Sequence, residues 1–221
     1  MRYGFIGCGN MGGAVARAVC RGVGPENVVL ANRTPAKAEA LAEALGCRAA
    51  TNDVVAQDCD VIFLGVKPQM MADMLAGIAP ILAKRSGRFV LVTMAAGLSM
   101  ARVREMAGGA YPIIRIMPNT PASVGEGMIQ YCSSHVTAEE EAEFCKLMAP
   151  AGRLDPVPEA LIDAASCVSG CGPAWVYQFI EALADGGVAC GLPRAKAQEY
   201  AAQMVLGSAK LVLESGKHPG P

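Results

Sequence analysis

Tyr3-Gly4-Phe5-Ile6-Gly7-Cys8-Gly9-Asn10-Met11-Gly12-Gly13 is the stretch that decides the fold of this chain of 221 residues. Its first four residues predict a short buried strand, and a helix is predicted from Asn10 to about Cys20. Between them, residues 7–12 have the pattern G-x-G-x-x-G. The first glycine of this pattern makes a tight turn, the second lets the backbone approach a pyrophosphate, and the third lets helix and strand pack closely. The N–H groups at the start of such a helix bind anions, so we expect a dinucleotide here, although glycines also serve ordinary turns.

The residues after the second predicted strand, Asn27 to Ala31, indicate which dinucleotide would bind. Folds that bind NAD usually place an Asp or Glu there, which binds the ribose 2′-hydroxyl. This chain has Asn32-Arg33-Thr34 instead. A guanidinium group forms forked, charge-assisted hydrogen bonds with a phosphate, so the sequence favours NADP(H) over NAD(H). The same residues can form a loop and a helix cap, with Thr34 as N-cap before Pro35, and the two roles are compatible.

Composition and charge exclude several classes of protein. The residues are 52% apolar and the net charge is −1, so the chain lacks the basic surface of a nucleic-acid-binding protein. No apolar run approaches the length of a membrane span, and too few apolar residues follow Met1-Arg2 for a signal-peptide core. Nine cysteines, an odd number without a signal peptide, indicate reduced thiols in a cytoplasmic protein.

A metal site is not expected. Cys167 and Cys171 lack a second pair at the spacing of zinc ligands, and the two histidines are His135 and His218. These cysteines are expected to be small core residues instead.

Predicted strands alternate with predicted helices over the first 157 residues. Apolar runs such as Asp60 to Gly65 are typical of strands that are buried on both faces of a parallel sheet. The strands are expected at residues 3–6, 27–31, 48–50, 60–65, 89–93, 113–117, 127–131 and 153–157. The helices are expected at residues 10–20, 35–45, 52–57, 69–82 and 137–148, with another from Ser99, and Thr137 and Glu140 have the pattern of a capping box. This alternation predicts an α/β fold, a Rossmann-type, doubly wound and mostly parallel sheet that binds NADP, in residues 1–157.

Residues 158–221 contain only predicted helices. A long helix after the Gly170-Cys171-Gly172-Pro173 loop carries Trp175 and Phe179 at helical spacing. Helices with apolar residues on more than one face cannot bury them alone. We therefore expect an all-α dimerisation domain, in which each tail packs on the tail of its partner in a homo-oligomer. Gly186-Gly187, in the middle of the long helix, would allow a neighbouring backbone to approach closely.

Three loops lie where ligands of such sheets bind, beyond the carboxyl ends of strands. They are Val66-Lys67-Pro68-Gln69, Ala95-Ala96-Gly97 and Met117-Pro118-Asn119-Thr120-Pro121. Each alone is also consistent with an ordinary turn. Together with the glycine pattern they form a rim of small residues, amides and one ammonium group, which suits a nicotinamide ring better than a bulky apolar ligand.

Taken together, several motifs of this chain are highly specific. They are Gly-Phe-Ile-Gly-Cys-Gly-Asn-Met-Gly at 4–12, Val-Lys-Pro at 66–68, Ala-Ala-Gly at 95–97 and Arg-Ile-Met-Pro-Asn-Thr-Pro at 115–121. The most specific is Ser-Gly-Cys-Gly-Pro-Ala-Trp at 169–175, continued by Glu-Ala-Leu-Ala-Asp-Gly-Gly-Val at 181–188 and Gly-Leu-Pro-Arg at 191–194. In these motifs the chain resembles the pyrroline-5-carboxylate reductases, enzymes that make proline, essentially from end to end.

The resemblance implies an enzyme that reduces the cyclic imine L-1-pyrroline-5-carboxylate to L-proline. It implies NADPH as the cofactor, with NADH as a weaker alternative, in a cytoplasmic homodimer or larger homo-oligomer. It also implies that residues 7–12 hold the pyrophosphate, that the residues near 32 and 52 lie by the adenosine ribose and its phosphate, and that the later loops line the rest of the groove. The expected cofactor-binding residues are Gly7, Cys8, Gly9, Asn10, Met11, Gly12, Asn32, Arg33, Thr34, Asn52, Val66, Lys67, Pro68, Ala95, Ala96 and Gly97.

Glu159 matches a glutamate of the family and is the candidate for substrate binding. It is equally consistent with a carboxylate that the dipole favours at a helix N-terminus. In the implied reaction a hydride leaves C4 of the nicotinamide and adds to the imine carbon, while the nitrogen takes up a proton. Much of the catalysis is then the positioning of one ring against the other, with the substrate carboxylate held by backbone amides. No Ser–His or Cys–His pair is identifiable, so no residue is assigned as a catalytic acid.

The carboxyl end of the chain departs from the family pattern. After His218-Pro219-Gly220 the family continues through Leu-Lys-Asp into a Ser-Pro-Gly-Gly-Thr-Thr loop, which supplies much of the substrate carboxylate site and a threonine near the imine nitrogen. This chain stops at Pro221, and we expect it to be part of a longer protein because the preceding helices keep the family pattern. Trp175 in place of Tyr or Phe, and Cys171 in place of Ser, are milder changes.

Two other hypotheses remain at this stage. One is a different NADP oxidoreductase of the same build, such as a β-hydroxyacid dehydrogenase, which needs a catalytic Lys in the first helix after the linker. No Lys occurs between Lys146 and Lys196. The other is an NADP-binding dimer without catalysis, favoured only if Pro221 is the true end.

Overall fold

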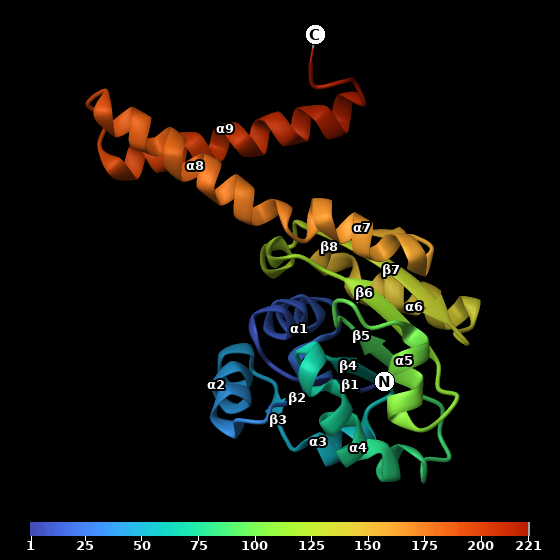
Figure 1. Ribbon diagram of the computed structural model, residues 1–221. Coiled ribbons are helices and arrows are strands. Elements are labelled where there is room, and N and C mark those ends of the chain that lie inside the picture. Colours follow the sequence, from blue (N-terminus) through green and yellow to red (C-terminus); the bar gives the residue numbers. More distant parts are fainter. Residues whose placement is uncertain (221) are drawn as a thin grey trace. The chain divides into compact units, whose positions relative to one another are not determined.

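A mostly parallel sheet is the centre of the amino-terminal part of the chain in the computed structural model, which describes residues 1–220 (Figure 1). Over these residues the sheet has eight strands in the order β3-β2-β1-β4-β5-β6-β7-β8. Strands β6 and β7 are antiparallel, and the other neighbouring pairs are parallel. The strands are β1 Tyr3–Ile6, β2 Val28–Ala31, β3 Arg48–Ala49, β4 Val61–Leu64, β5 Val90–Thr93, β6 Ile113–Met117, β7 Gly127–Ser134 and β8 Gly152–Pro156.

Apolar side chains on both faces of the sheet explain why these short runs form central strands. On one face, Phe5 and Phe63 stack with ring centroids 4.4 Å apart, and helices α1 (Asn10–Val23), α2 (Pro35–Leu45) and α6 (Ala138–Met148) cover them. On the other face, residues such as Ile62 and Leu91 pack under helices α3 (Asn52–Asp58), α4 (Met71–Leu82) and α5 (Met100–Ala107). Helices on both faces of a parallel sheet are the doubly wound arrangement, so the predicted fold class is confirmed.

Local sequence signals determine several helix ends. Thr51 accepts a hydrogen bond from the N–H of Val54 at the start of α3. The predicted capping box at the start of α6 is present, with Thr137 and Glu140 each accepting from the backbone N–H of the other. Gly46 ends α2 with φ of 73°, a left-handed conformation that favours glycine.

Most predicted bounds differ from the observed ones by a residue at one or both ends, and three elements differ more. Helix α1 extends to Val23 and ends where Gly24 takes φ of 83°. The helix predicted at 69–82 begins as the 3-10 turn η2 (Pro68–Met70), and α4 follows it. Strand β7 extends to Ser134 because its second half, from Gln130 to Ser134, pairs with β6, with Ile113 opposite Ser134.

Helix α7 (Glu159–Ser169) packs on the sheet. Its Ile162 is fully buried, and the residues just before it continue the sheet through a hydrogen bond from Val157 N to Tyr131 O of 2.9 Å. The first compact unit of the chain accordingly runs from Met1 to Gly170, and a second unit begins at Cys171. The sequence places the domain boundary after residue 157, before α7, and that boundary remains a prediction.

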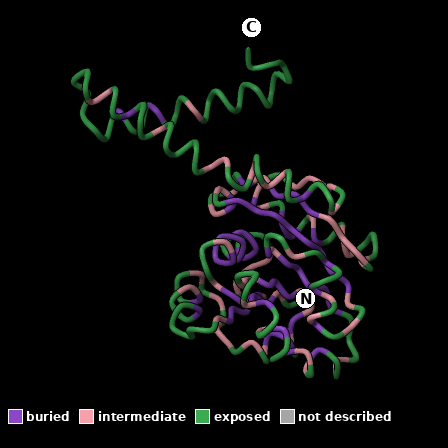
Figure 2. The backbone as a smooth tube through the Cα atoms, in the orientation of Figure 1, coloured by how far each residue is buried: buried purple, intermediate pink, exposed green. Residues whose placement is uncertain are grey.

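The second unit contains two helices that pack on each other, α8 (Gly172–Ala189) and α9 (Arg194–Ser215). Ala184, Ala197 and Ala201 are buried between them. Within this unit, a Cβ added to Gly187 would lie 3.1 Å from the Cβ of Ala197, and one added to Gly186 would meet no described atom within 4 Å. The approach of a neighbouring backbone at these glycines stays a prediction. Most of both helices is exposed (Figure 2).

The cysteines are only partly core residues. All nine are free thiols, and Cys20 and Cys59 are buried. The prediction of core positions is wrong for Cys167 and Cys171, which are exposed, as is Cys190. These three lie on or beside helices α7 and α8, whose outer surfaces a single chain leaves uncovered.

Candidate cofactor-binding site

The glycine turn between β1 and α1 has the geometry that its sequence predicts. Gly7 has φ of 104°, a conformation that side chains rarely allow. A Cβ added to Gly12 would collide with the carbonyl oxygen of Gly7, and so would one added to Gly65, which follows β4. Because these three residues are glycines, the backbones of the turn, of helix α1 and of the residue after β4 can contact one another directly.

Gly9 lies in open space, in contrast to its neighbours. A Cβ added there would have no atom within 4 Å. Gly9 is the N-cap residue of α1, and among the described residues 1–220 no side chain forms a capping hydrogen bond at the start of this helix. A pyrophosphate binds where helix N–H groups are uncapped and where no side chain blocks its approach to the backbone. This turn therefore fits a dinucleotide phosphate, with Asn10 and Met11 as the first residues of the helix.

Asn32 connects the glycine turn to the end of β2. Its Oδ1 accepts from the N–H of Cys8 at 3.1 Å, and its Nδ2 donates to the carbonyl of Thr34 at 3.0 Å. The thiol of Cys8 donates to the carbonyl of Ala31 at 3.4 Å, and burial raises its pKa to about 11. The thiol is therefore neutral at neutral pH and adds no negative charge beside the phosphate site.

A cleft of about 430 Å³ lies beyond the ends of β2 and β3. It brings together three of the predicted residues, Asn32, Arg33 and Asn52. Arg33 is exposed, and the Glu39 carboxylate also lines the cleft. Thr34 is the N-cap residue of α2, as predicted, but its side chain makes no capping hydrogen bond. The cleft thus places the Arg33 guanidinium and the Asn52 amide, with the Glu39 carboxylate, where a phosphorylated ribose could bind.

The loops after β4 and β5 lie at the same edge of the sheet, because these strands are parallel neighbours of β1. In the first loop, Val66 is half-buried, Lys67 and Pro68 are exposed, and Lys67 is the N-cap residue of η2. In the second loop, Ala95 is buried while Ala96 and Gly97 are exposed, with Gly97 at φ of 72°.

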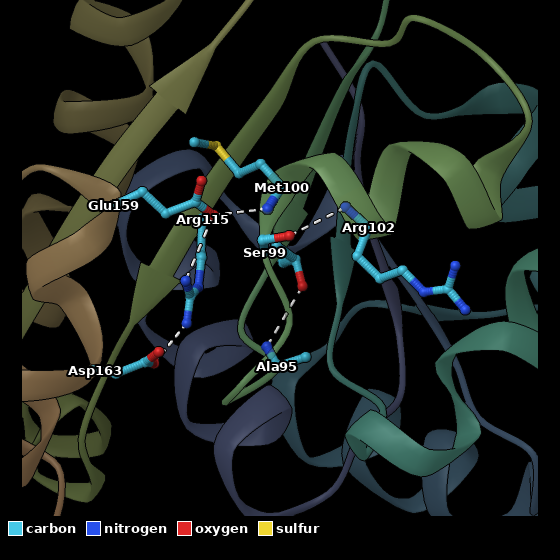
Figure 3. Close-up of polar contacts among 8 residues, drawn as sticks. Ala95, Ser99, Met100, Arg102, Arg115, Glu159 and Asp163 are labelled. Atoms are coloured by element: carbon cyan, nitrogen blue, oxygen red, sulfur yellow. Dashed lines mark hydrogen bonds and ion pairs between the residues drawn. The ribbon is translucent and has the colours of Figure 1, made fainter.

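A buried cation that is not among the predicted site residues lies behind the second loop. The Arg115 side chain is 3% exposed, and its Nη1 lies 3.4 Å from Oε1 of Glu159 and its Nη2 2.6 Å from Oδ1 of Asp163 (Figure 3). The same Glu159 oxygen accepts from the N–H of Met100 at 2.7 Å. An Arg inside the apolar strand 113–117 is the sequence signal for such a cluster, because a buried charge needs a partner.

The third predicted ligand loop is anchored internally at its centre. Asn119, which is 7% exposed, accepts from the N–H of Met128 at 3.1 Å and donates to the carbonyl of Ser169 at 3.0 Å. Ser169 in turn donates to Gln130 Oε1 at 2.8 Å. The Asn119 side chain thus holds the end of α7 against β7.

Within residues 1–220, no three side chains of His, Cys, Asp or Glu are grouped as a metal ion would require. No helix of the described chain combines the length and apolar character that a membrane crossing needs.

Comparison with family models gives two matches. Residues 159–221 match the model described as pyrroline-5-carboxylate reductase dimerisation, and residues 2–97 match the one described as NADP oxidoreductase, coenzyme F420-dependent. The first match begins at the start of α7, and the second covers the glycine turn and the loops after β4 and β5.

The chain is also similar to individual proteins along nearly its whole length. It is 41% identical to a pyrroline-5-carboxylate reductase of Escherichia coli, over 99% of this chain and 82% of the relative. It is 39% identical to the enzyme of Pisum sativum, over 98% of this chain and 79% of the relative. The crystal structure of Plasmodium falciparum pyrroline carboxylate reductase with NADP bound is 31% identical, with a TM-score of 0.87 over 99% of this chain and 81% of that one.

Proposed function

The chain belongs to the pyrroline-5-carboxylate reductase family, and from this we propose that it reduces L-1-pyrroline-5-carboxylate to L-proline with NADPH, the last step of proline biosynthesis. The observation that carries the proposal is the 41% identity to such an enzyme over 99% of the chain. It favours this activity over a β-hydroxyacid dehydrogenase and over a dimer without catalysis.

The open glycine turn supports NADPH as the cofactor. We assign the pyrophosphate to the turn and the first residues of α1, and the 2′-phosphate to the cleft that Arg33 lines. We assign the nicotinamide half of the cofactor to the two loops after β4 and β5. The proposed residues are Gly7, Cys8, Gly9, Asn10, Met11, Gly12, Asn32, Arg33, Thr34, Asn52, Val66, Lys67, Pro68, Ala95, Ala96 and Gly97.

The reaction needs one hydride and one proton. NADPH, when bound, supplies the hydride to the imine carbon, and a proton converts the imine nitrogen to the amine of proline. The residues of this chain contribute by holding the nicotinamide and the imine ring close together and correctly oriented, which lowers the activation barrier. We assign no residue as the proton donor, and a substrate contact by Glu159 remains a prediction.

We propose that the protein is a homodimer through its helical tail. The dimerisation-family match over 159–221 and the exposed apolar side chains of α8 and α9 support this. These side chains include Trp175, 68% exposed, and Phe179, 55% exposed. We also propose a cytoplasmic location, which nine free thiols support.

The activity is tested by mixing the full-length protein with NADPH and pyrroline-5-carboxylate and following the loss of nicotinamide absorbance. We expect turnover with this imine and a slower reaction with NADH. Tight NADPH binding without turnover would overturn the proposal in favour of a non-catalytic dimer, and turnover of hydroxy acids alone would favour a dehydrogenase.

A further inference from the structure

We propose that Glu159 and Arg115 are positioning residues for hydride transfer, because together they hold the loop of residues 95–99 in place. The inference rests on the proposed function in one respect, which is that the nicotinamide binds at this loop. The contacts themselves do not depend on that function (Figure 3).

The first contact joins α7 to the start of α5. Oε1 of Glu159, the first residue of α7, accepts from the N–H of Met100 at 2.7 Å, across 59 positions of sequence. Met100 is the first residue of α5, and it is buried. A carboxylate at the start of a helix is favoured by the dipole, and a charged acceptor makes the stronger kind of hydrogen bond. Glu159 therefore fixes the point at which the 95–99 loop becomes helix.

The second contact fixes Glu159 itself. Arg115 lies in the middle of β6 with its side chain 3% exposed, and its Nη1 is 3.4 Å from the same Oε1. Its Nε has no hydrogen-bond partner among the described residues. A buried guanidinium with an unsatisfied N–H depends strongly on the carboxylates it does reach. The Asp163 side chain is 62% exposed and that of Glu159 only 31%, so solvent screens the Asp163 pair more.

The 95–99 loop is thereby held at both ends. At its start, the N–H of Ala95 donates to Oγ1 of Thr93 at 3.4 Å. At its end, Ser99 accepts from the N–H of Arg102 at 3.2 Å, and Glu159 holds Met100. Between these ends Ala96 and Gly97 are exposed at the carboxyl edge of the sheet. A shift of Met100 moves the two residues that we assign to the nicotinamide half of the cofactor.

The two roles open to Glu159, positioning and substrate contact, predict different kinetics. A group that only positions the nicotinamide changes the rate of hydride transfer, since misplacement by about 1 Å costs on the order of 100-fold. A carboxylate that binds the substrate instead changes the apparent affinity for the imine. Glu159 also lines a cleft of about 500 Å³, so both roles are sterically open and the kinetics must distinguish them.

The test compares three variants of the full chain in the NADPH-dependent reduction of pyrroline-5-carboxylate. Glu159→Ala removes the acceptor for Met100, and we expect kcat to fall by about 10- to 100-fold with KM for the imine within about threefold. Glu159→Gln keeps an oxygen acceptor at the same place, and we expect it to recover most of that loss. Asp163→Asn is the matched control: it removes the charge of the more exposed partner of Arg115 but keeps an oxygen acceptor for Nη2, and it does not touch the loop. We expect kcat within about twofold of the wild type.

Two kinetic outcomes would overturn the positioning role. One is an unchanged kcat in Glu159→Ala. The other is a raised KM for the imine in both Glu159→Ala and Glu159→Gln, which would show that the charge of Glu159 binds the substrate.

Hydrogen exchange keeps this inference separate from the proposed function. In the protein without cofactor, we expect peptides that cover residues 94–100 to exchange faster in Glu159→Ala than in the wild type, and at the wild-type rate in Asp163→Asn. If the variant exchanges faster but the wild type does not reduce the imine, the proposed function is refuted and the positioning of the loop by Glu159 is kept. Unchanged exchange would refute this positioning whatever the activity.

Discussion

Single glycines decide whether the phosphate turn exists and whether it stays open. Gly9 and Gly12 differ in what a side chain would meet, so they give a matched pair of variants. In Gly12→Ala the new methyl group collides with the Gly7 carbonyl, and we expect a loss of about 1–3 kcal/mol in the free energy of unfolding together with loss of NADPH binding. In Gly9→Ala the methyl group meets open space, so stability should stay near wild type while NADPH affinity falls by about tenfold or more, because the methyl group occupies the phosphate site.

Denaturant unfolding and NADPH fluorescence titration check this pair. Wild-type NADPH affinity in Gly9→Ala would contradict a pyrophosphate at this turn.

Arg33 is the residue on which the preference for NADPH depends. We expect Arg33→Ala to weaken NADPH binding by about tenfold and to leave NADH binding nearly unchanged, because only NADPH carries the 2′-phosphate. Lys37→Ala, which removes another exposed cation in the first turn of α2, is the control and should change neither affinity. Titration of both cofactors into each variant is the measurement. Equal loss for NADPH and NADH would show that Arg33 does not contact the 2′-phosphate.

At the scale of the elements, the stability of helix α6 depends on pH through an ion pair at its start. Arg88 donates to Glu140 through Nε at 2.5 Å and Nη2 at 2.8 Å, and this pair, with the N–H of Thr137, lowers the pKa of the Glu140 carboxyl below its ordinary value of 4.5. A carboxyl whose pKa is lower in the folded state stabilises the fold above its unfolded pKa, and the contribution is lost as the pH falls through the folded pKa. The start of α6 should therefore be acid-sensitive.

We expect Glu140→Gln to melt at a lower temperature than the wild type at neutral pH, and the difference to shrink as the pH falls below about 4.5. Glu143→Gln is the control, because Glu143 lies on the same helix in an exposed pair with Lys146 and should shift the melting temperature little at any pH. Thermal unfolding followed by circular dichroism measures both. A difference that does not change with pH would show that the charge of Glu140 contributes nothing.

At the scale of the whole molecule, the helical tail exposes apolar surface that a single chain does not bury. Between α8 and α9 lies an open groove of about 600 Å³. It is lined by Trp175, Val176, Phe179, Met204, Val205, Ser208, Ala209 and Val212. Large exposed apolar patches mark interaction surfaces, so this groove is where the partner tail of the proposed dimer would pack.

We expect Phe179→Glu to convert the oligomer to single chains in sedimentation velocity, because a buried Phe contributes roughly 1.5–3 kcal/mol in each subunit and a buried unpaired carboxylate costs more. Gln178→Glu adds the same charge at the neighbouring exposed position and is the control. It should keep the oligomer of the wild type. An oligomer that survives Phe179→Glu would place the interface elsewhere.

Sequence reasoning predicted each strand of the sheet and the fold class because the signals are local. The apolar runs, the glycine turn and the capping box at Thr137 each depend on neighbours within a few residues. It did not predict that α7 packs on the sheet, that Cys167 is exposed, or that Arg115 is paired. Each of these depends on which distant surfaces meet, and a single sequence does not encode that in any short window.

The sequence by itself determined the alternating α/β order, the phosphate turn and, through its motifs, the family. Only the tertiary structure decided what the polar groups at the edge of the sheet do. The order β5-β6-β7 brings Arg115 of β6, the start of α5 after β5 and the start of α7 to one place, although 59 positions separate Met100 from Glu159. The physical reason is that a buried charge and a helix N-terminus take whichever partner the packing brings within hydrogen-bond distance, and only the folded chain sets that distance.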